Sequence, residues 1–199
     1  MRFRVIVTRL RVMLLKIVQT GDPVLRTPAR PLSAEDIASA EVQRLIELMR
    51  ETMRDAPGVG LAAPQIGLPL QLAVIEDAGE VEATDRRPVP FHVIINPQIT
   101  LGDERVDFFE GCLSVDGYQA VVPRARTARV AARDHRGEAI SIDASGWYAR
   151  ILQHEIDHLN GTLYIDRMRT RTFGTSRNVA RYVPGIPIAD LLAGLGEKG

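Results

Sequence analysis

The sequence predicts an α+β fold in a single domain, with mostly antiparallel sheets packed around a helix that carries two histidines. Short apolar runs, separated by Gly, Pro and polar residues, fill the middle of the chain. One amphipathic helical pattern precedes these runs and a second follows them. The 199 residues suit one domain with a sizeable core.

Composition restricts the class of protein. Lys+Arg and Asp+Glu number 25 each, so no overall positive field favours nucleic acid or anionic lipid. The single cysteine excludes an internal disulfide and is typical of a reducing compartment. No apolar run approaches the roughly 20 residues that a membrane span requires. We therefore expect a cytoplasmic protein that binds neither nucleic acid nor membranes directly.

The first 16 residues carry five basic side chains and no acidic one. Organellar targeting segments are basic, but they are also rich in serine, which is absent here, and charges interrupt each apolar run. We favour an upstream start codon with Met13 as the working start. Residues 1–12 would then be an extension, and organellar targeting is the alternative.

Residues 33–57 predict the first helix. Ser33 is a suitable N-cap with Asp36 as its capping-box partner, and Pro57 with Gly58 ends the pattern. Because its methionines lie on the apolar face, they are core residues rather than ligands. That face consists of Val42, Leu45, Ile46, Met49 and Met53.

A glycine-broken segment at 58–67 follows, and then come six apolar runs that predict strands. These runs lie at 70–75, 91–97, 105–110, 119–123, 127–133 and 139–143. The sequence DHRGE at 134–138 predicts a hairpin turn between the last two strands. The polar stretch 76–88 predicts a mobile loop.

The second helix is expected to begin near Asp143 or Ser145 and to end at Asn160, followed by Gly161. One face of this helix presents Trp147, Ile151, His154 and His158. The tail at 174–199 is rich in Gly and Pro, and within it residues 188–195 predict a short helix.

His154, Glu155 and His158 form an H-E-x-x-H sequence on the second helix. Residues i and i+4 share a helix face, so the two histidines can bind one metal ion, while Glu155 can reach a water on that ion. A third ligand is still required. Zinc proteases take their third ligand from a residue downstream of this motif. No suitable residue stands at those positions here, because residue 164 is Tyr and the next glutamate is Glu197.

Three other residues remain as candidates for the third ligand. His135 lies in a charged turn, and His92 begins an apolar strand. Cys112 offers a soft thiolate beside a glycine, which lets the backbone pass close to an ion. We favour Cys112, although a lone cysteine is more often a buried apolar residue. Cys-His-His leaves a fourth position for water, which is typical of catalytic sites.

Three segments, in order, resemble the signatures of the peptide deformylase family: GVGLAAPQ (58–65), EGCLS (110–114) and QHEIDHL (153–159). QTGDPVLR (19–26) is similar to that family's amino-terminal strand and loop. The resemblance implies one deformylase-like catalytic domain over 1–199. Its activity would be hydrolysis of the N-formyl group from formyl-methionyl nascent polypeptides, releasing formate. It also implies one Fe2+ ion per chain, with Zn2+, Ni2+ or Co2+ able to substitute.

The resemblance also implies a role for each site residue. The metal ligands are Cys112, His154 and His158, and Glu155 is the general acid and base. Gln65 and the backbone N–H of Leu113 hold the developing oxyanion, and Gly60 supplies backbone contacts to the substrate. The pocket for the methionine side chain consists of Val59, Gly60, Phe108, Trp147 and Ile151.

Some features leave alternatives open. Glu110 and Asp157 either orient ligands and nearby arginines or form surface salt bridges. Asp116 stands where the family often has proline. Many bacterial members end in a long basic helix thought to dock at the ribosome exit region, but Pro184 and Pro187 break this tail. Docking in that way is therefore in doubt, and we expect a monomer.

Two other functions fit the sequence less well. A metalloendopeptidase shares H-E-x-x-H, but its downstream ligand is missing. A non-catalytic module that binds formyl peptides or metal would not need a general base, so Glu155, with Gln65 and Cys112, argues against it. The prediction is therefore an enzyme acting on formyl-methionyl peptides.

Overall fold

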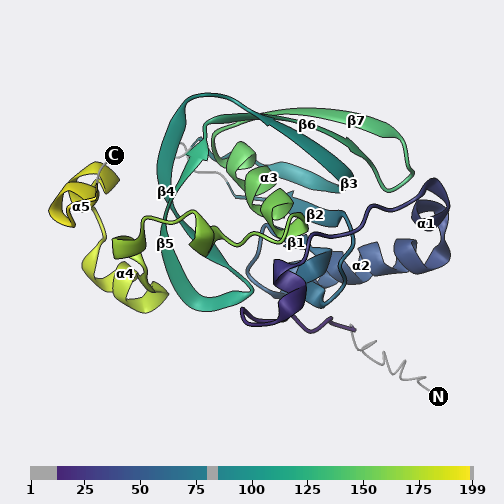
Figure 1. Cartoon of the computed structure of the whole chain (residues 1–199), viewed down its shortest axis with the longest axis horizontal. Helices are drawn as coiled ribbons and strands as arrows, with labels where there is room; N and C mark the ends of the chain where they lie inside the picture. Colours follow the sequence, from purple (N-terminus) through teal and green to yellow (C-terminus); the bar gives the residue numbers. More distant parts are fainter. Residues whose placement is uncertain (1–12, 80–84, 198–199) are drawn as a thin grey trace, which may run out of the picture.

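Two antiparallel sheets and the helices packed on them form the computed structural model, which describes residues 13–79 and 85–197 (Figure 1). The mixture of helices and antiparallel sheets in one domain confirms the predicted fold class. The extension expected at 1–12, and residues 80–84 of the expected loop, lie outside the described residues.

The larger sheet has the strand order β1-β2-β3-β6-β7, and the smaller sheet has the order β4-β5-β8. The larger sheet consists of β1 (Gly60–Ala62), β2 (Leu72–Asp77), β3 (Val89–Leu101), β6 (Thr127–Arg133) and β7 (Ala139–Ser145). The smaller consists of β4 (Arg105–Cys112), β5 (Val115–Ala125) and β8 (Gly174–Thr175). Each predicted strand overlaps one of β2 to β7. The predicted turn between β6 and β7 is confirmed, with the Gly137 N–H donating to the Asp134 carbonyl.

The helix expected at 33–57 is divided into α1 (Ala34–Ala38) and α2 (Ala40–Asp55). Ser33 and Asp36 form the predicted capping box. Ser39 then leaves the helical conformation, and its hydroxyl accepts a hydrogen bond from the Val42 N–H, so it caps α2. The prediction of one continuous helix was wrong here, because a serine side chain that bonds to the backbone competes with helical geometry.

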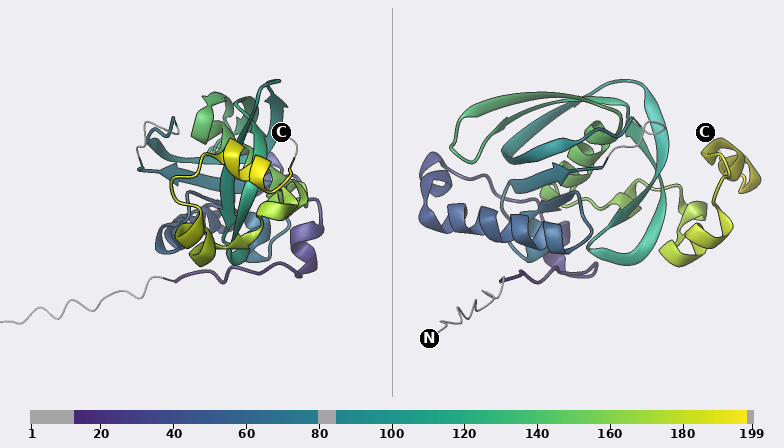
Figure 2. Two further views of the ribbon diagram at one scale, coloured as in Figure 1. Left: turned by 90° about the vertical axis from the view of Figure 1, so that its left-hand side faces the viewer. Right: turned by 180° about the vertical axis from the view of Figure 1, so that it is seen from behind.

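Strand β2 is apolar at consecutive positions because both faces of the larger sheet are covered at this strand. Leu72 and Val74 belong to a core cluster with the apolar face of α2. Ala73 and Ile75 belong to a second cluster with α3 (Gly146–Leu159). Helix α3 also contacts β5 of the smaller sheet. Figure 2 shows the sheets and these two helices from two further sides.

The start and end of α3 have local causes. Ser145 is its N-cap, which confirms one predicted start, whereas Asp143 lies in β7 and pairs with Arg129 of β6. After Leu159 the chain reverses at Gly161, which has φ +73°. A Cβ atom there would lie 2.8 Å from the backbone of Arg26, so this close approach requires glycine.

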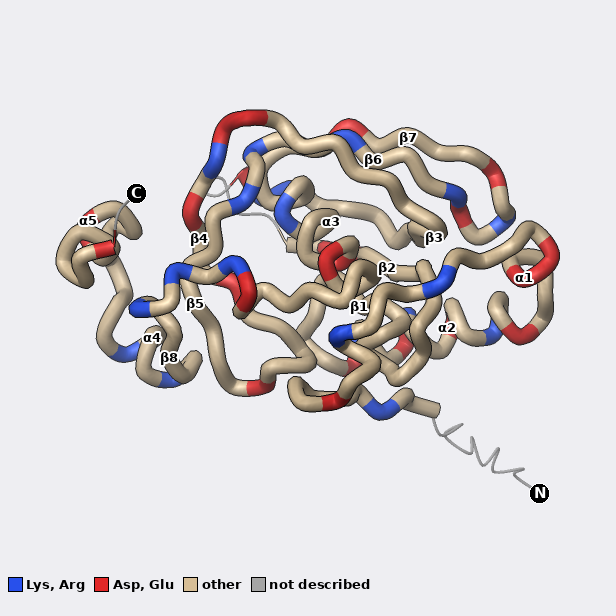
Figure 3. The backbone as a smooth tube through the Cα atoms, viewed as in Figure 1, with Lys and Arg blue, Asp and Glu red and all other residues tan. Residues whose placement is uncertain are grey.

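The tail folds back onto the smaller sheet. β8 pairs with β5, and two seven-residue helices follow, α4 (Ser176–Tyr182) and α5 (Ile188–Gly194). The predicted helix at 188–195 is confirmed. Basic and acidic residues are interspersed over most of the backbone, but α4 carries only basic ones (Figure 3). Among the described residues, no helix is long and apolar enough to cross a membrane.

Candidate metal centre and active site

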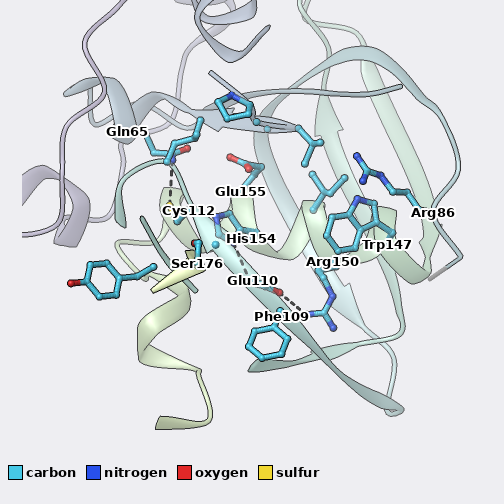
Figure 4. Close-up of a pocket in the computed structure, with 18 of the residues that line it drawn as sticks. Gln65, Arg86, Phe109, Glu110, Cys112, Trp147, Arg150, His154, Glu155 and Ser176 are labelled. Atoms are coloured by element: carbon cyan, nitrogen blue, oxygen red, sulfur yellow. Dashed lines mark hydrogen bonds and ion pairs between the residues drawn. The ribbon is translucent and has the colours of Figure 1, made fainter. Parts of the chain in front are cut away.

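Cys112 at the end of β4 meets the two histidines of α3, which lie on one helix face as the i and i+4 spacing predicts. Figure 4 shows Cys112 beside His154. One ligand atom from each of the three side chains lies within 4.8 Å of the others. His92, the alternative ligand, instead bonds to the Tyr148 hydroxyl at 2.9 Å and the Pro90 carbonyl at 2.9 Å. Within the described ranges, no other group of three such side chains could hold an ion.

The geometry of this cluster fits a divalent ion. Cys112 Sγ lies 3.2 Å from His158 Nε2. A thiolate and an imidazole on one tetrahedral ion, with bonds of about 2.3 and 2.0–2.1 Å, lie about 3.6 Å apart. His158 Nδ1 and Glu155 Oε2 are buried without a hydrogen-bond partner. The set of one sulfur and two nitrogens suits zinc or ferrous iron better than calcium or magnesium.

The electrostatics of the cluster also favour a cation. Burial lowers the pKa of His154, but Cys112 and Glu110 outweigh burial and raise it well above the ordinary value. Burial and the charge of His154 lower the pKa of His158. A divalent ion can replace the proton of an imidazole held in this way, because metal ligands must be deprotonated, so metal binding is expected to release protons.

Glu155 lies beside this cluster and is only 4% exposed. Burial raises its pKa to about 7, and a divalent ion nearby would favour the ionised form. A carboxylate that titrates near neutral pH can both accept and return a proton. A Cβ atom on Gly60 would overlap the Glu155 carboxylate, so β1 passes this close only because residue 60 is glycine.

Gln65 lies in the short 3-10 helix Ala63–Ile66 that follows β1. Its Oε1 accepts a hydrogen bond from the Ala62 N–H at 2.9 Å, which directs Nε2 toward the cluster. Nε2 lies 3.6 Å from Cys112 Sγ (Figure 4). It also lies 3.4 Å from the Ser114 hydroxyl. The backbone therefore fixes the orientation of an amide donor beside the candidate metal centre.

Glu110 and Asp157 are buried, so the surface alternative for both residues is excluded. The Glu110 carboxylate accepts hydrogen bonds from Arg124 at 3.0 Å and from Arg150 at 2.6 Å. It also lies 3.2 Å from His154 Nδ1. This contact makes Nδ1 the protonated nitrogen and leaves Nε2 for an ion. Asp157 pairs with Arg124 and with Arg167.

Burial raises the pKa of Glu110, but the hydrogen bonds from His154 and Arg124 outweigh it. The pKa of that carboxyl is therefore held well below its ordinary value. Glu110 thus remains an anion behind His154, and this increases the basicity of the histidine as a ligand.

A cavity of about 430 Å³ opens onto the cluster. Of the residues predicted for the methionine pocket, Val59, Gly60, Trp147 and Ile151 line it, and so do Gln65, Cys112, Leu113, His154 and Glu155. Phe108 does not, and Phe109 lines the cavity instead. The guanidinium of Arg150, a lining residue, lies over the Phe108 ring, 5.1 Å from its centre, so it covers one face of Phe108.

Several residues that line the cavity were not predicted from the sequence. Arg150 could have been found, because it precedes His154 by four residues and shares its helix face. Phe109 is harder, since the β4–β5 pairing shifts register between Gly111 and Cys112 and counting alternate residues from Cys112 fails. Arg86 and Ser176 come from segments that carry no signal of proximity to the motifs.

The comparison with known proteins decides the family. The sequence profile for polypeptide deformylase matches residues 14–173. The chain belongs to the polypeptide deformylase family. It is 53% identical over 173 residues to the chloroplastic peptide deformylase 1A of Solanum lycopersicum, which is 82% of this chain and 62% of that protein. The chain thus spans less than two thirds of that relative's length.

Bacterial deformylases are also similar. Peptide deformylase 1 of Streptomyces coelicolor is 49% identical over 172 residues, which is 83% of this chain and 78% of that one. The crystal structure of a class I type b peptide deformylase from Acinetobacter baumannii, with Met-Ala-Ser bound, superposes with a TM-score of 0.75 at 32% identity. The match covers 79% of this chain and 99% of that chain.

Cys112→Ser is expected to lower the affinity for metal, because a serine hydroxyl stays protonated at neutral pH where the thiol can ionise. Removing a residue that merely hydrogen-bonds to a metal ligand lowers metal affinity roughly 10–100-fold, so removing the ligand itself should lower it at least as much. Metal content after dialysis against a graded chelator measures it, with His135→Ala as the control. Wild-type metal retention in Cys112→Ser would show that the thiol is not a ligand.

Proposed function

We propose that this chain is a metal-dependent amide hydrolase that removes the N-formyl group from formyl-methionyl nascent polypeptides and releases formate. Removal of that group is the known activity of the deformylase family. The observation that carries the proposal is the meeting of Cys112, His154 and His158 beside Glu155, where a cavity opens. A donor set with a free fourth position and an adjacent general base suits hydrolysis.

Cys112, His154 and His158 would hold one ion. We propose Fe2+ from the family resemblance, with Zn2+, Ni2+ or Co2+ able to substitute. When bound, such an ion supplies Lewis acidity, which lowers the pKa of water from about 16 toward 7 and stabilises negative charge on a carbonyl oxygen. The contact between Glu110 and His154 Nδ1 leaves Nε2 as the nitrogen that would bind the ion.

Glu155 would move the proton. Its carboxylate takes a proton from the attacking water and returns it to the nitrogen of the departing peptide amine. Burial beside Gly60 keeps bulk water away from the carboxylate and supports the near-neutral pKa that both transfers need. One residue therefore serves as base and then as acid.

Gln65 and Leu113 would stabilise the developing oxyanion. As the formyl carbon becomes tetrahedral, negative charge develops on its oxygen. Gln65 Nε2 is held in place by the bond from Ala62 to Oε1, so little reorganisation is needed when the charge appears. The Leu113 N–H is the second proposed donor. Each such donor is worth about 10²–10³ in rate.

The cavity supports selectivity for methionine. Val59, Trp147 and Ile151, which line the cavity, would supply an apolar wall next to the cluster, and Phe109 replaces Phe108 in our assignment. An unbranched thioether can follow such a wall without a polar partner. Gly60 would contribute backbone contacts to the peptide.

The remaining proposals concern partners and place. Named relatives include both bacterial and chloroplastic deformylases. We propose a bacterial-type cytoplasmic monomer that acts on nascent chains and does not bind nucleic acid directly. Docking at the ribosome exit region by a long basic helix is not supported, because Pro184 and Pro187 separate the short helices α4 and α5.

The deciding experiment uses purified protein kept anaerobic with Fe2+. We expect it to release formate from formyl-Met-Ala-Ser and to leave acetyl-Met-Ala-Ser intact, because an acetyl methyl group crowds the site of attack. Mass spectrometry of a longer peptide checks that internal bonds survive. Absence of formate from metal-loaded protein would contradict the proposal, and internal cleavage would favour a metalloendopeptidase instead.

A further inference from the structure

A bonded group of three side chains lies at the side of the cavity away from Cys112. Arg86 and Trp147 form this part of the lining (Figure 4). Behind them is Asp77, the last residue of β2, which is 3% exposed. None of the three signature motifs contains any of these residues, and the proposed chemistry does not use Asp77 or Arg86.

Asp77 is the centre of the group. Its two carboxylate oxygens accept hydrogen bonds from Arg86 Nη2 and Nε, each at 2.7 Å. The Trp147 indole N–H donates to Oδ2 at 3.1 Å, and the Gly79 N–H donates to Oδ1 at 2.8 Å. Arg86 also lies over the indole, with its guanidinium carbon 5.4 Å from the ring centre. Trp147 is thus held at its edge by Asp77 and on its face by Arg86.

Asp77 and Arg86 neutralise each other's charge. Burial raises the pKa of Asp77, but the bonds from Arg86 and Gly79 outweigh it and lower the pKa below its ordinary value. The anion is neutralised by a two-pronged arginine, and its oxygens are already acceptors for four N–H groups. A buried carboxylate whose hydrogen bonds are all made in this way restricts the conformation of its partners, which suits a positioning role.

Trp147 is placed where a methionine side chain would end. It precedes His154 by seven residues on one face of α3, which is about 10.5 Å along the helix axis. From formyl carbon to terminal methyl, an extended methionine spans about 7–8 Å with ordinary bond lengths. A side chain that starts at the cluster and follows Ile151 would therefore extend toward the indole, since both residues line the same cavity.

We propose that Asp77 and Arg86 are positioning residues for substrate selectivity. By holding Trp147 as the end wall of the pocket, they limit the length of the first side chain to that of methionine. This inference deepens the proposed deformylase function and rests on it. Rigid support matters because a wall that can move accepts longer side chains and fits methionine less closely.

Asp77→Ala tests the proposal, because it removes the acceptor for Trp147 and the counter-charge of Arg86 together. The measurement is kcat/KM for formyl-Met-Ala-Ser and for the same peptide with straight-chain 2-aminooctanoate in place of methionine. We expect the ratio of the two values to fall at least about tenfold, the lower end of what pocket contacts contribute to discrimination. Arg86→Ala, at a partly exposed residue, should shift the ratio in the same direction.

The chain contains one tryptophan, so its fluorescence reports Trp147 alone. Asp77→Ala and Arg86→Ala should lower its anisotropy and shift its emission to longer wavelength, with or without metal. Asp77→Asn keeps an oxygen for the indole N–H and should preserve most of both signals. These readouts separate support of Trp147 from a general loss of stability.

Asp143→Ala is the matched control, because Asp143 also pairs with an arginine but is exposed and does not line this cavity. If both Asp77→Ala and Arg86→Ala match this control in selectivity ratio and Trp147 anisotropy, the inference is overturned. If no variant and no wild-type protein releases formate, the deformylase proposal fails by itself. The anisotropy comparison still decides whether Asp77 and Arg86 hold Trp147. If the anisotropy of both variants equals that of the wild type, the positioning role is overturned as well. Should Asp77→Ala not fold, Arg86→Ala provides both tests.

Discussion

Glu155→Gln is expected to reduce the rate of formate release about 10²–10⁴-fold, which is the usual contribution of a positioned general acid or base. The carboxamide has nearly the same shape, so it fits the buried space beside Gly60. It cannot accept a proton from water or return one to the leaving amine. Because Glu155 does not belong to the Cys112–His154–His158 cluster, the variant should still bind one ion per chain.

The assay measures kcat together with metal content on the same sample. Glu76→Gln makes the same chemical change at a residue whose side chain pairs with Arg54 and does not line the cavity, and it should leave kcat unchanged. Retained metal with turnover near that of this control would show that another group carries the proton. Loss of metal from Glu155→Gln would instead assign Glu155 a part in binding the ion.

The metal cluster shows which parts of a site a sequence can predict. His154 and His158 are four residues apart, so helix geometry alone places them together. Cys112 lies far away in sequence, and only ligand chemistry and the family resemblance connected it to them. The structure brings all three together because the end of β4 lies beside α3. Local periodicity therefore predicts contacts within an element, whereas contacts between elements need a chemical requirement or a known relative.

Other residues were beyond prediction because their surroundings are tertiary. Glu110 and Asp157 could equally have been surface charges. Their burial depends on arginines from elsewhere in the chain, and Arg124 of β5 is the one that bonds to both. Phe108 was assigned to the pocket, but Arg150 covers it. Asp77 and Arg86 come from a polar segment that resembled an ordinary loop. In each case a deciding partner, namely Arg124, Arg150 or Trp147, comes from a distant part of the chain.

Ser39 shows the limit of periodicity within a single element. The apolar face continues through residues 33–57 as expected, and the predicted core positions of α2 are buried or half-buried. The pattern, however, does not report whether a serine side chain turns back to its own backbone. The hydroxyl of Ser39 does so, and α1 and α2 separate there.

Arg124→Ala is expected to be strongly destabilising. Arg124 is 4% exposed and lies between two buried carboxylates, with Glu110 on one side and Asp157 on the other. Removing one partner of a buried ion pair leaves an uncompensated charge and typically costs about 3–5 kcal/mol in the free energy of unfolding. Arg150 and Arg167 still bond one carboxylate each, so they reduce the loss but cannot bridge the two.

Urea unfolding of wild-type and variant protein, both stripped of metal by chelator, measures this loss without a contribution from bound ion. Arg129→Ala removes an exposed arginine that pairs with Asp143, and such surface pairs contribute about 0–1 kcal/mol. Arg124→Lys should recover little, because an ammonium cannot make the two parallel bonds that a guanidinium makes to Glu110. An unfolding free energy of Arg124→Ala equal to that of Arg129→Ala would mean that the two carboxylates find water or new partners. Glu110, which orients His154, would then be held by Arg150 rather than by Arg124.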